Sequence, residues 1–129
     1  MNVMRYTATV SRDKNAWTAQ CVEHPQAHTW ARSLVQLRTA IKEAIILAAD
    51  LPDDAAFGVD LVADASVPAD LADALPLGNR RMALLAEQEQ VAASASGSAK
   101  SLTRCGYSTR DVAGALAISA GRVSQLVAS

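Results

Sequence analysis

The hydrophobic pattern of the first half of the chain changes period at Ser33, and this change limits the folds available to it. Apolar and polar residues alternate over residues 3–10 and again over residues 16–22, which is typical of half-buried β-strands. The segment between them contains Asp13, Lys14 and Asn15, residues that favour tight turns. We therefore predict an antiparallel β-hairpin over residues 3–22.

Two further short strands are expected on either side of a helix. Pro25 should end the second strand, because proline has no N–H to donate to a neighbouring strand. Residues 27–31 fit a short third strand, and residues 57–62 fit a fourth. The order strand, strand, strand, helix, strand predicts a small α+β domain.

The helix of this domain should begin after Ser33. Ser33 and Gln36 fit a capping box, and Pro52 disfavours a helical Leu51, so the helix should end near Asp50. Apolar residues recur between these limits at helical spacing, which predicts one buried face. The members of that face are Leu34, Leu37, Ile41, Ala44, Ile45 and Ala48.

The middle of the chain gives a weaker pattern. Residues 68–76 are acidic and rich in alanine and allow a turn of helix, and residues 80–91 fit a longer helix. Residues 92–99 (AASASGSA) are low in complexity. Because Gly97 lowers helix propensity, this segment fits either a frayed helix or a flexible hinge.

Residues 101–128 carry the most specific pattern in the chain, SLTRCGYSTRDVAGALAISAGRVSQLVA. A short helix that includes Leu102 should stop at Gly106, since glycine favours the position after a helix end. A second helix over residues 110–116 and a third that begins after Ser119 should follow, because serine is a preferred N-terminal cap. Two short helices joined by a tight turn are typical of a helix-turn-helix.

Side-chain size and polarity agree with this interpretation. Ser108 or Thr109 can cap the second helix, and the small Ala113 suits the point where two helices cross. Ala117 occupies the turn, where glycine is more usual. The inward-facing residues are expected to be Val112, Ala113, Leu116, Val123 and Leu126.

A helix-turn-helix places the first residues of its last helix against base edges in the DNA major groove. Gln125 can pair with adenine through two hydrogen bonds, and arginines can neutralise phosphates. One module reads only a few base pairs, so we expect a homodimer or a higher oligomer. The predicted DNA-binding residues are Arg104, Thr109, Arg110, Ser119, Ala120, Gly121, Arg122, Ser124 and Gln125.

Residues 5–54, RYTATVSRDKNAWTAQCVEHPQAHTWARSLVQLRTAIKEAIILAADLPDD, resemble the HicB family of type II antitoxins. The shared pattern is a hairpin, a proline-containing connection, a third strand, and a helix rich in Ala, Leu and Glu that ends at Leu-Pro. The resemblance implies a partial RNase H-like fold that binds and blocks a HicA-like toxin, a small ribonuclease that cleaves mRNA. It also implies that a C-terminal module binds the promoter of its own operon.

These observations divide the chain into three parts. The fold class is α+β, with a β-β-β-α-β N-terminal domain followed by an all-α helix-turn-helix. The expected boundaries are residues 1–66 for a HicB-like toxin-binding domain, 67–99 for an acidic, helical linker, and 100–129 for the DNA-binding module.

Charge is distributed unevenly along the chain, although its net charge is only −1. Residues 50–78 contain seven aspartates and no base, whereas residues 100–129 contain four bases and one acid. A basic end is consistent with a nucleic-acid contact. The acidic stretch fits a solvated surface or a contact with a basic toxin.

Composition excludes membrane, collagen-like and wholly disordered classes. Half of the residues are apolar, but no apolar run approaches the length of a membrane span, and no signal sequence is evident. The two cysteines, Cys21 and Cys105, form no disulfide framework. We therefore expect a soluble protein of the reducing cytoplasm.

No catalytic, metal or cofactor site is expected. A nuclease of the RNase H type needs clustered carboxylates to hold metal ions, and residues 3–10 contain no acid. Cys21, His24 and His28 supply three ligands where structural zinc prefers four. Cys105 is expected to be a small packing residue.

The candidate contacts for a toxin are two tryptophans and two aspartates. Trp17 and Trp30 can belong to the core or to a partner interface, where tryptophan is enriched. Trp30 is the better candidate for exposure, because it lies between the Pro25 connection and the Ser33 cap. Asp53 and Asp54 belong to the acidic stretch.

Three functions remain open. The first is a non-enzymatic antitoxin that also represses its own operon. The second is a stand-alone transcription regulator whose N-terminal domain dimerises or senses a ligand. The third is an interaction scaffold whose last helices pack on another protein.

Overall fold

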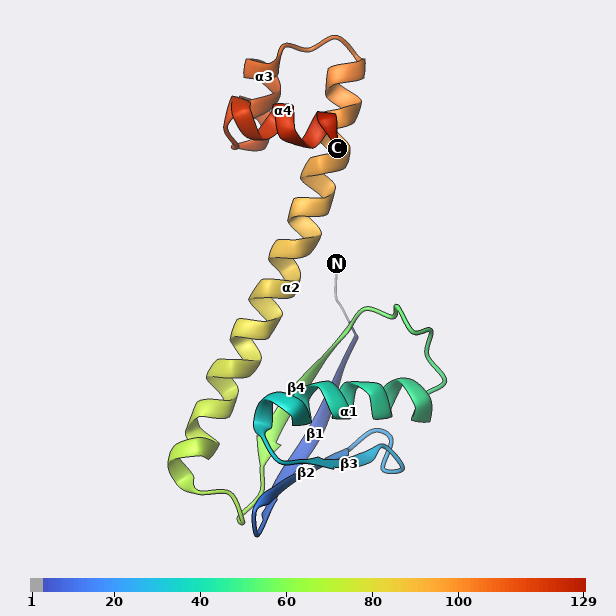
Figure 1. The fold of residues 1–129 in the computed structure, drawn as a ribbon, viewed down its shortest axis with the longest axis vertical. Coiled ribbons are helices and arrows are strands. Elements are labelled where there is room, and N and C mark those ends of the chain that lie inside the picture. The colour runs from blue at the N-terminus through green and yellow to red at the C-terminus, as the bar shows by residue number, and fades with distance from the viewer. Residues whose placement is uncertain (1–3) are drawn as a thin grey trace. The chain divides into compact units, whose positions relative to one another are not determined.

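The computed structural model describes residues 4–129 (Figure 1), and the chain divides into two compact units between Ala83 and Leu84. The α+β class is confirmed: a β-β-β-α-β arrangement precedes the remaining helices. The elements are β1 (Met4–Asp13), β2 (Ala16–Cys21), β3 (His28–Ala31), α1 (Leu34–Ala48), β4 (Phe57–Ala63), α2 (Ala69–Arg104), α3 (Thr109–Leu116) and α4 (Ala120–Ala128).

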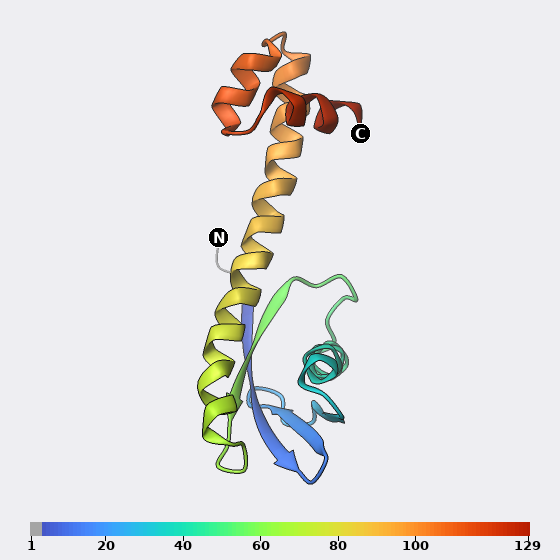
Figure 2. The same cartoon turned by 60° about the vertical axis from the view of Figure 1, so that its left-hand side comes forward.

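The first unit contains a four-stranded mixed sheet with the order β3-β2-β1-β4. β2 pairs antiparallel with both β1 and β3, whereas β4 pairs parallel with β1. A parallel neighbour requires a crossover connection, and α1 supplies it by covering one face of the sheet (Figure 2). In register, Ala8 of β1 lies beside Cys21 of β2 and Leu61 of β4.

The core of this unit follows the predicted alternation. Tyr6, Ala8 and Val10 of β1 are buried, and the predicted face of α1 packs over the same side of the sheet. Val3, which the alternation assigned to the first strand, lies outside the described residues. Asp13 pairs with Ala16 in the hairpin, so the turn contains only Lys14 and Asn15. We expected a three-residue turn segment that also included Asp13.

Both ends of α1 are fixed by local hydrogen bonds. The Ser33 hydroxyl accepts from the Gln36 N–H at 3.1 Å, as the capping box predicts. The helix ends at Ala48 because Asp50 adopts a left-handed φ of 53°. The Leu51 N–H then donates to the Ile46 carbonyl at 2.9 Å, which closes the last turn in the manner of a Schellman motif.

α2 is one helix from Ala69 to Arg104, so the segment 92–99, which fitted either a frayed helix or a hinge, is helical. Its first turns belong to the first unit, where Val67 and Leu75 are buried in the core. The expected domain boundary at residue 66 therefore lies before Val67 and Leu75, which belong to the core of the first unit. No helix within residues 4–129 is both long and apolar enough to cross a membrane.

Asn79 of α2 occupies the outer edge of the sheet. Its Nδ2 donates to the Leu61 carbonyl at 3.0 Å, and its Oδ1 accepts from the Leu61 N–H at 3.1 Å. Arg38 of α1 donates to the same Oδ1 at 3.2 Å. An edge strand presents unpaired backbone groups, and the buried amide pairs with both groups of Leu61 as another strand would.

An ion pair joins β1 and β4 on the face of the sheet opposite α1. The Arg5 guanidinium donates through Nε to Asp60 Oδ2 at 3.1 Å and through Nη2 to Oδ1 at 2.5 Å. This bidentate contact lowers the pKa of Asp60. Gly58 lies under the guanidinium, where a Cβ would meet Arg5 Nη1, so a larger residue at that position would displace the Arg5 side chain.

Replacing Asn79 tests the edge contact. Asn79→Ala leaves a buried N–H and a buried carbonyl of Leu61 without partners, and we expect it to lower the free energy of unfolding by about 2–4 kcal/mol. Chemical denaturation followed by circular dichroism measures this loss. Gln90→Ala, on an exposed part of the same helix, is the matched control and should change stability by less than about 0.5 kcal/mol. Equal stability of the two variants would contradict the assigned role of Asn79.

The Arg5–Asp60 pair predicts a pH dependence. The folded-state pKa of Asp60 lies below its ordinary value of 3.8, so its stabilising effect is complete above that value and is lost as the pH falls through the folded-state pKa. Because solvent screens this half-exposed pair, Asp60→Asn should cost about 0.5–1 kcal/mol at neutral pH. Urea unfolding at a series of pH values should show wild type and variant converging in acid. A constant difference across the series would rule out this linkage.

Candidate nucleic-acid interface

The second unit is a compact helical module in which α3 and α4 pack against the end of α2. Its core consists of Ala99, Val112, Ala113 and Val123, which are all buried. Ala113 is the small residue predicted for the helix crossing, and α3 and α4 are joined by residues 117–119. The two short helices and their tight connection agree with the expected helix-turn-helix geometry.

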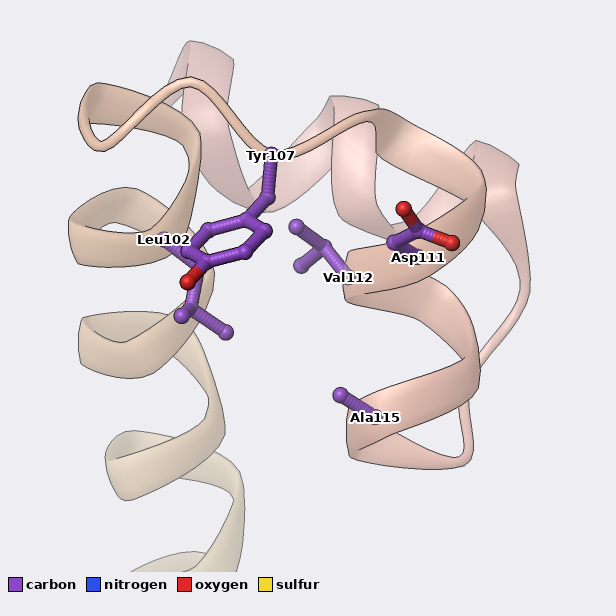
Figure 3. A pocket seen from close by; sticks show the side chains of 5 residues that line it. All are labelled: Leu102, Tyr107, Asp111, Val112 and Ala115. Atoms are coloured by element: carbon purple, nitrogen blue, oxygen red, sulfur yellow. The ribbon is translucent and has the colours of Figure 1, made fainter.

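A Schellman motif ends α2 and sets the direction in which the chain enters α3. Gly106 has a φ of 94°, and its N–H donates to the Thr103 carbonyl at 3.0 Å. The Tyr107 N–H donates to the Leu102 carbonyl at 3.2 Å, and the side chains of Tyr107 and Leu102 face each other (Figure 3). This apolar contact commonly accompanies the motif.

Serine caps begin both helices of the module. The Ser108 hydroxyl accepts from the Asp111 N–H at 3.1 Å, so Ser108 rather than Thr109 caps α3. The Ser119 hydroxyl accepts from the Arg122 N–H at 3.0 Å. Each cap satisfies a backbone donor that has no partner inside its helix.

The turn between the helices depends on a left-handed residue. Ala117 has φ 57° and ψ 41°, and its N–H bonds to the Ala113 carbonyl. The Ile118 N–H reaches the same carbonyl at 3.0 Å. The turn therefore has the conformation for which glycine is usual, although this chain supplies an alanine there.

The first turns of α4 present a polar face to solvent. Val123 alone among the residues from Ala120 to Gln125 is buried. Arg122 Nη1 donates to Gln125 Oε1 at 3.3 Å, which holds the two side chains together. The amide of Gln125 keeps both N–H donors and a second oxygen lone pair for a base.

The two serines of α4 are already engaged in the helix. Ser119 accepts at its cap, and the Ser124 hydroxyl donates to the Ala120 carbonyl at 3.3 Å. Ser119 therefore retains its proton to donate to a phosphate, while Ser124 retains its lone pairs to accept from a base. We predicted that Ser119 and Ser124 both contact DNA. Their hydrogen bonds within the helix leave Ser119 as a donor and Ser124 as an acceptor for that contact.

The remaining predicted DNA-binding residues lie on other elements. Arg104 is the last residue of α2, and Thr109 and Arg110 form the first turn of α3. All three are exposed. They are therefore accessible to phosphates, whereas Arg122 and Gln125, three positions apart in α4, lie side by side on one face of that helix.

Two features of this module differ from or extend the sequence analysis. Cys105 is exposed, so its assignment as a packing residue is wrong; it follows the last residue of α2 on a turn open to solvent. Tyr107 is 58% exposed and lines an apolar groove with Leu102, Asp111, Val112 and Ala115 (Figure 3). In the sequence, only the position of Tyr107 directly after Gly106 could have indicated that Tyr107 lines this groove.

The candidate toxin contacts separate into buried and exposed groups. Trp17 is buried in the core, with the Arg12 guanidinium 4.3 Å above its ring, so it does not offer a free surface. Trp30 on β3 is 61% exposed, and Asp53 and Asp54 are exposed in the connection between α1 and β4. Trp30 and the two aspartates therefore remain accessible candidates.

The first unit does not gather metal-ligand side chains. Among residues 4–129, no three His, Cys, Asp or Glu side chains come together in a way that could hold a metal ion. Burial raises the pKa of the Cys21 thiol, which keeps it protonated and unreactive. Two carboxylates near the sheet already have partners: Asp60 pairs with Arg5, and Asp64 accepts from Ser11 and Ser66.

Comparison of the chain with models of protein families, with curated proteins and with solved structures finds no match.

The turn at Ala117 gives a testable stability effect. A left-handed conformation costs a non-glycine residue about 1–2 kcal/mol, so Ala117→Gly should stabilise the second unit by about 1 kcal/mol after the extra chain entropy of glycine is subtracted. Ala115→Gly, in the last turn of α3, is the matched control and should destabilise it by up to about 1 kcal/mol. Thermal unfolding measures both changes. A loss of stability in Ala117→Gly would show that this turn is not left-handed in solution.

Proposed function

We propose that this chain is a DNA-binding antitoxin that represses its own operon. In this proposal α3 and α4 bind operator DNA, and the first unit binds and occludes a small, basic, HicA-like ribonuclease toxin. The chain itself is not an enzyme and needs no cofactor. The protein acts in the cytoplasm as a homodimer or a higher oligomer.

The face of α4 is the observation that carries the DNA-binding half of the proposal. A serine-capped helix exposes Arg122 and Gln125 side by side and Ser124 on a separate flank, while Val123 anchors the helix in the core. These side chains supply one phosphate contact and two hydrogen-bonding groups for base edges. The exposed Arg104 and Arg110 add positive charge nearby in sequence, which favours a polyanionic partner.

The toxin-binding half rests on the first unit and on the resemblance of residues 5–54 to HicB antitoxins. Trp30 projects from β3 with most of its surface exposed, although tryptophan is usually largely buried. Exposed tryptophans are frequent anchors of protein interfaces. The exposed Asp53 and Asp54 supply negative charge that would complement a basic toxin.

A stand-alone transcription regulator is the second candidate. It shares the α4 face but assigns the first unit to dimerisation or ligand sensing. A toxin-like reading frame beside the gene would favour the antitoxin. Binding of the first unit to its own copy, with no adjacent partner, would favour the regulator.

Operator binding is tested with the full-length chain and DNA from upstream of its own gene. Fluorescence anisotropy should show specific binding that weakens as salt increases, because phosphate contacts release counterions. Gln125→Ala should cost about 1–3 kcal/mol on the operator and little on unrelated DNA. Arg122→Ala should weaken binding to both DNAs, and Gln90→Ala on the exposed part of α2 is the control. No binding by wild type, or binding unaffected by these substitutions, would contradict the proposal.

Toxin binding is tested by co-expression with the product of each adjacent small gene. We expect a stable complex with a short basic protein and rescue of growth when that protein is toxic alone. Trp30→Ala should weaken the complex by about tenfold or more, as a central aromatic contact does. Absence of both complex and rescue would remove the antitoxin half and leave the stand-alone regulator.

A further inference from the structure

The end of α2 and the first turns of α3 border an apolar groove that neither DNA nor toxin binding uses (Figure 3). Its volume is about 260 Å³, near the lower end of the range for small-molecule pockets. All the residues that line it belong to the second unit. We call it the Tyr107 groove; its lining residues are Leu102, Tyr107, Asp111, Val112 and Ala115.

The local structure of the chain leaves this space open. The Schellman motif at Gly106 separates α2 from α3 and sets the Tyr107 ring against Leu102. Val112 is 1% exposed and belongs to the core of the module, so the groove has a fixed apolar floor. Ala115 has too short a side chain to close the gap beside α3. Apolar groups therefore bound the groove on several sides.

A single carboxylate marks one end of the groove. Asp111 and Ala115 are four positions apart, so they lie on the same face of α3, about 6 Å apart along the helix axis. Asp111 is exposed and is the only charged residue that lines the groove; the neighbouring Arg110 does not line it. Within residues 4–129, no cation lies within ion-pair distance of the Asp111 carboxylate. That carboxylate is therefore available to a positively charged ligand.

The Tyr107 ring favours the same sign of charge. Tyr107 is 58% exposed, and its ring lies between the Leu102 and Val112 side chains (Figure 3). The face of an aromatic ring attracts cations electrostatically. A carboxylate and an aromatic face beside one apolar groove complement a molecule with an apolar body and a positive end.

We propose that the Tyr107 groove binds a small organic amine. The apolar body of the amine lies against Leu102, Val112 and Ala115, and its ammonium group donates to the Asp111 carboxylate near the Tyr107 ring. This inference goes beyond operator and toxin binding and depends on neither. It gives the helical module a ligand site of its own.

The size of the groove selects a small molecule over a protein. A stable protein interface buries about 800 Å² on each partner, which requires an apolar surface that extends well beyond five residues. The apolar surface does not continue along α2: Ser98, one turn before Leu102 on the same face, is polar and exposed, and so is Ser101. A compact ligand therefore matches the groove better than a protein surface.

Three probes of similar shape and different charge test the proposal: phenethylamine, the neutral 2-phenylethanol and the anionic phenylacetate. Each is titrated into the full chain and followed by ¹H–¹⁵N NMR. Phenethylamine should cause saturable shifts in the amides of Tyr107, Val112 and Ala115. It should bind at least about threefold more tightly than the alcohol, because it adds an ion pair and a cation–π contact, and phenylacetate should bind most weakly. No saturable shift at these residues, or equal affinity for the amine and the alcohol, would overturn the proposal.

Two substitutions assign the site. Asp111→Asn should reduce the preference for the amine over the alcohol, whereas Glu87→Gln, which removes an exposed carboxylate from α2, is the matched control and should not change it. Ala115→Leu, at an exposed position, should fill the groove and weaken both probes by about tenfold or more; the NMR spectrum checks that the variant is folded. An unchanged preference in Asp111→Asn, or unchanged binding in Ala115→Leu, would contradict the proposed site. Loss of operator binding with amine binding intact would overturn only the proposed function.

Discussion

The pairing of the Asn79 amide with the backbone of Leu61 is the contact on which the arrangement of the first unit depends. β4 is one of the two edge strands of the sheet, and its parallel pairing with β1 leaves its other edge without a strand. Asn79 satisfies both backbone groups of Leu61 at that edge and also accepts from Arg38 of α1. One buried amide thereby joins the sheet, α1 and α2, and it protects part of an edge that would otherwise template association with another strand.

Left-handed residues decide where the chain turns in both units. Lys14, Asp50, Gly106 and Ala117 all have positive φ, and each lies in a turn of the hairpin or at the end of a helix. Gly106 takes this conformation without steric cost, whereas Ala117 takes it because Ala113, Ile118 and the Ser119 cap hold the turn on both sides. The geometry of α3 and α4 is therefore a property of short-range bonds around residues 113–122, which also set the exposed face of α4.

Local periodicity was sufficient to predict the strands and α1, and the capping preference of serine was sufficient to predict the helix starts. Alternation separated Tyr6, Ala8 and Val10, which the structure buries, from the other face of the strand, and helical spacing identified the buried face of α1. It could not predict that α2 is continuous, because Pro76 and Gly97 both disfavour a helix interior and local propensity indicated interruptions there. The role of Asn79 was also inaccessible, since its partner is a backbone group 18 positions away in sequence. The position of Trp30 between Pro25 and Ser33 correctly indicated its exposure, whereas the burial of Trp17 follows only from the packed sheet.

The candidate site was predicted more completely than its supporting contacts. The exposed residues of α4 follow from the cap at Ser119 and from the inward positions of Val123 and Leu126, which the sequence displays directly. The Arg122–Gln125 contact and the helix bond of Ser124 depend on rotamers, which no spacing pattern specifies. These contacts orient the groups that would meet a base in the proposed DNA complex.

We propose that this chain recognises a specific DNA sequence through α4, as a dimer. The most direct test is selection of bound DNA from a random-sequence library by the full-length protein, followed by sequencing. We expect enrichment of an inverted repeat, because two-fold related modules read two half-sites. Enrichment that disappears in an Arg122→Ala and Gln125→Ala double variant would assign the readout to α4. A library that remains unenriched after selection would contradict the claim.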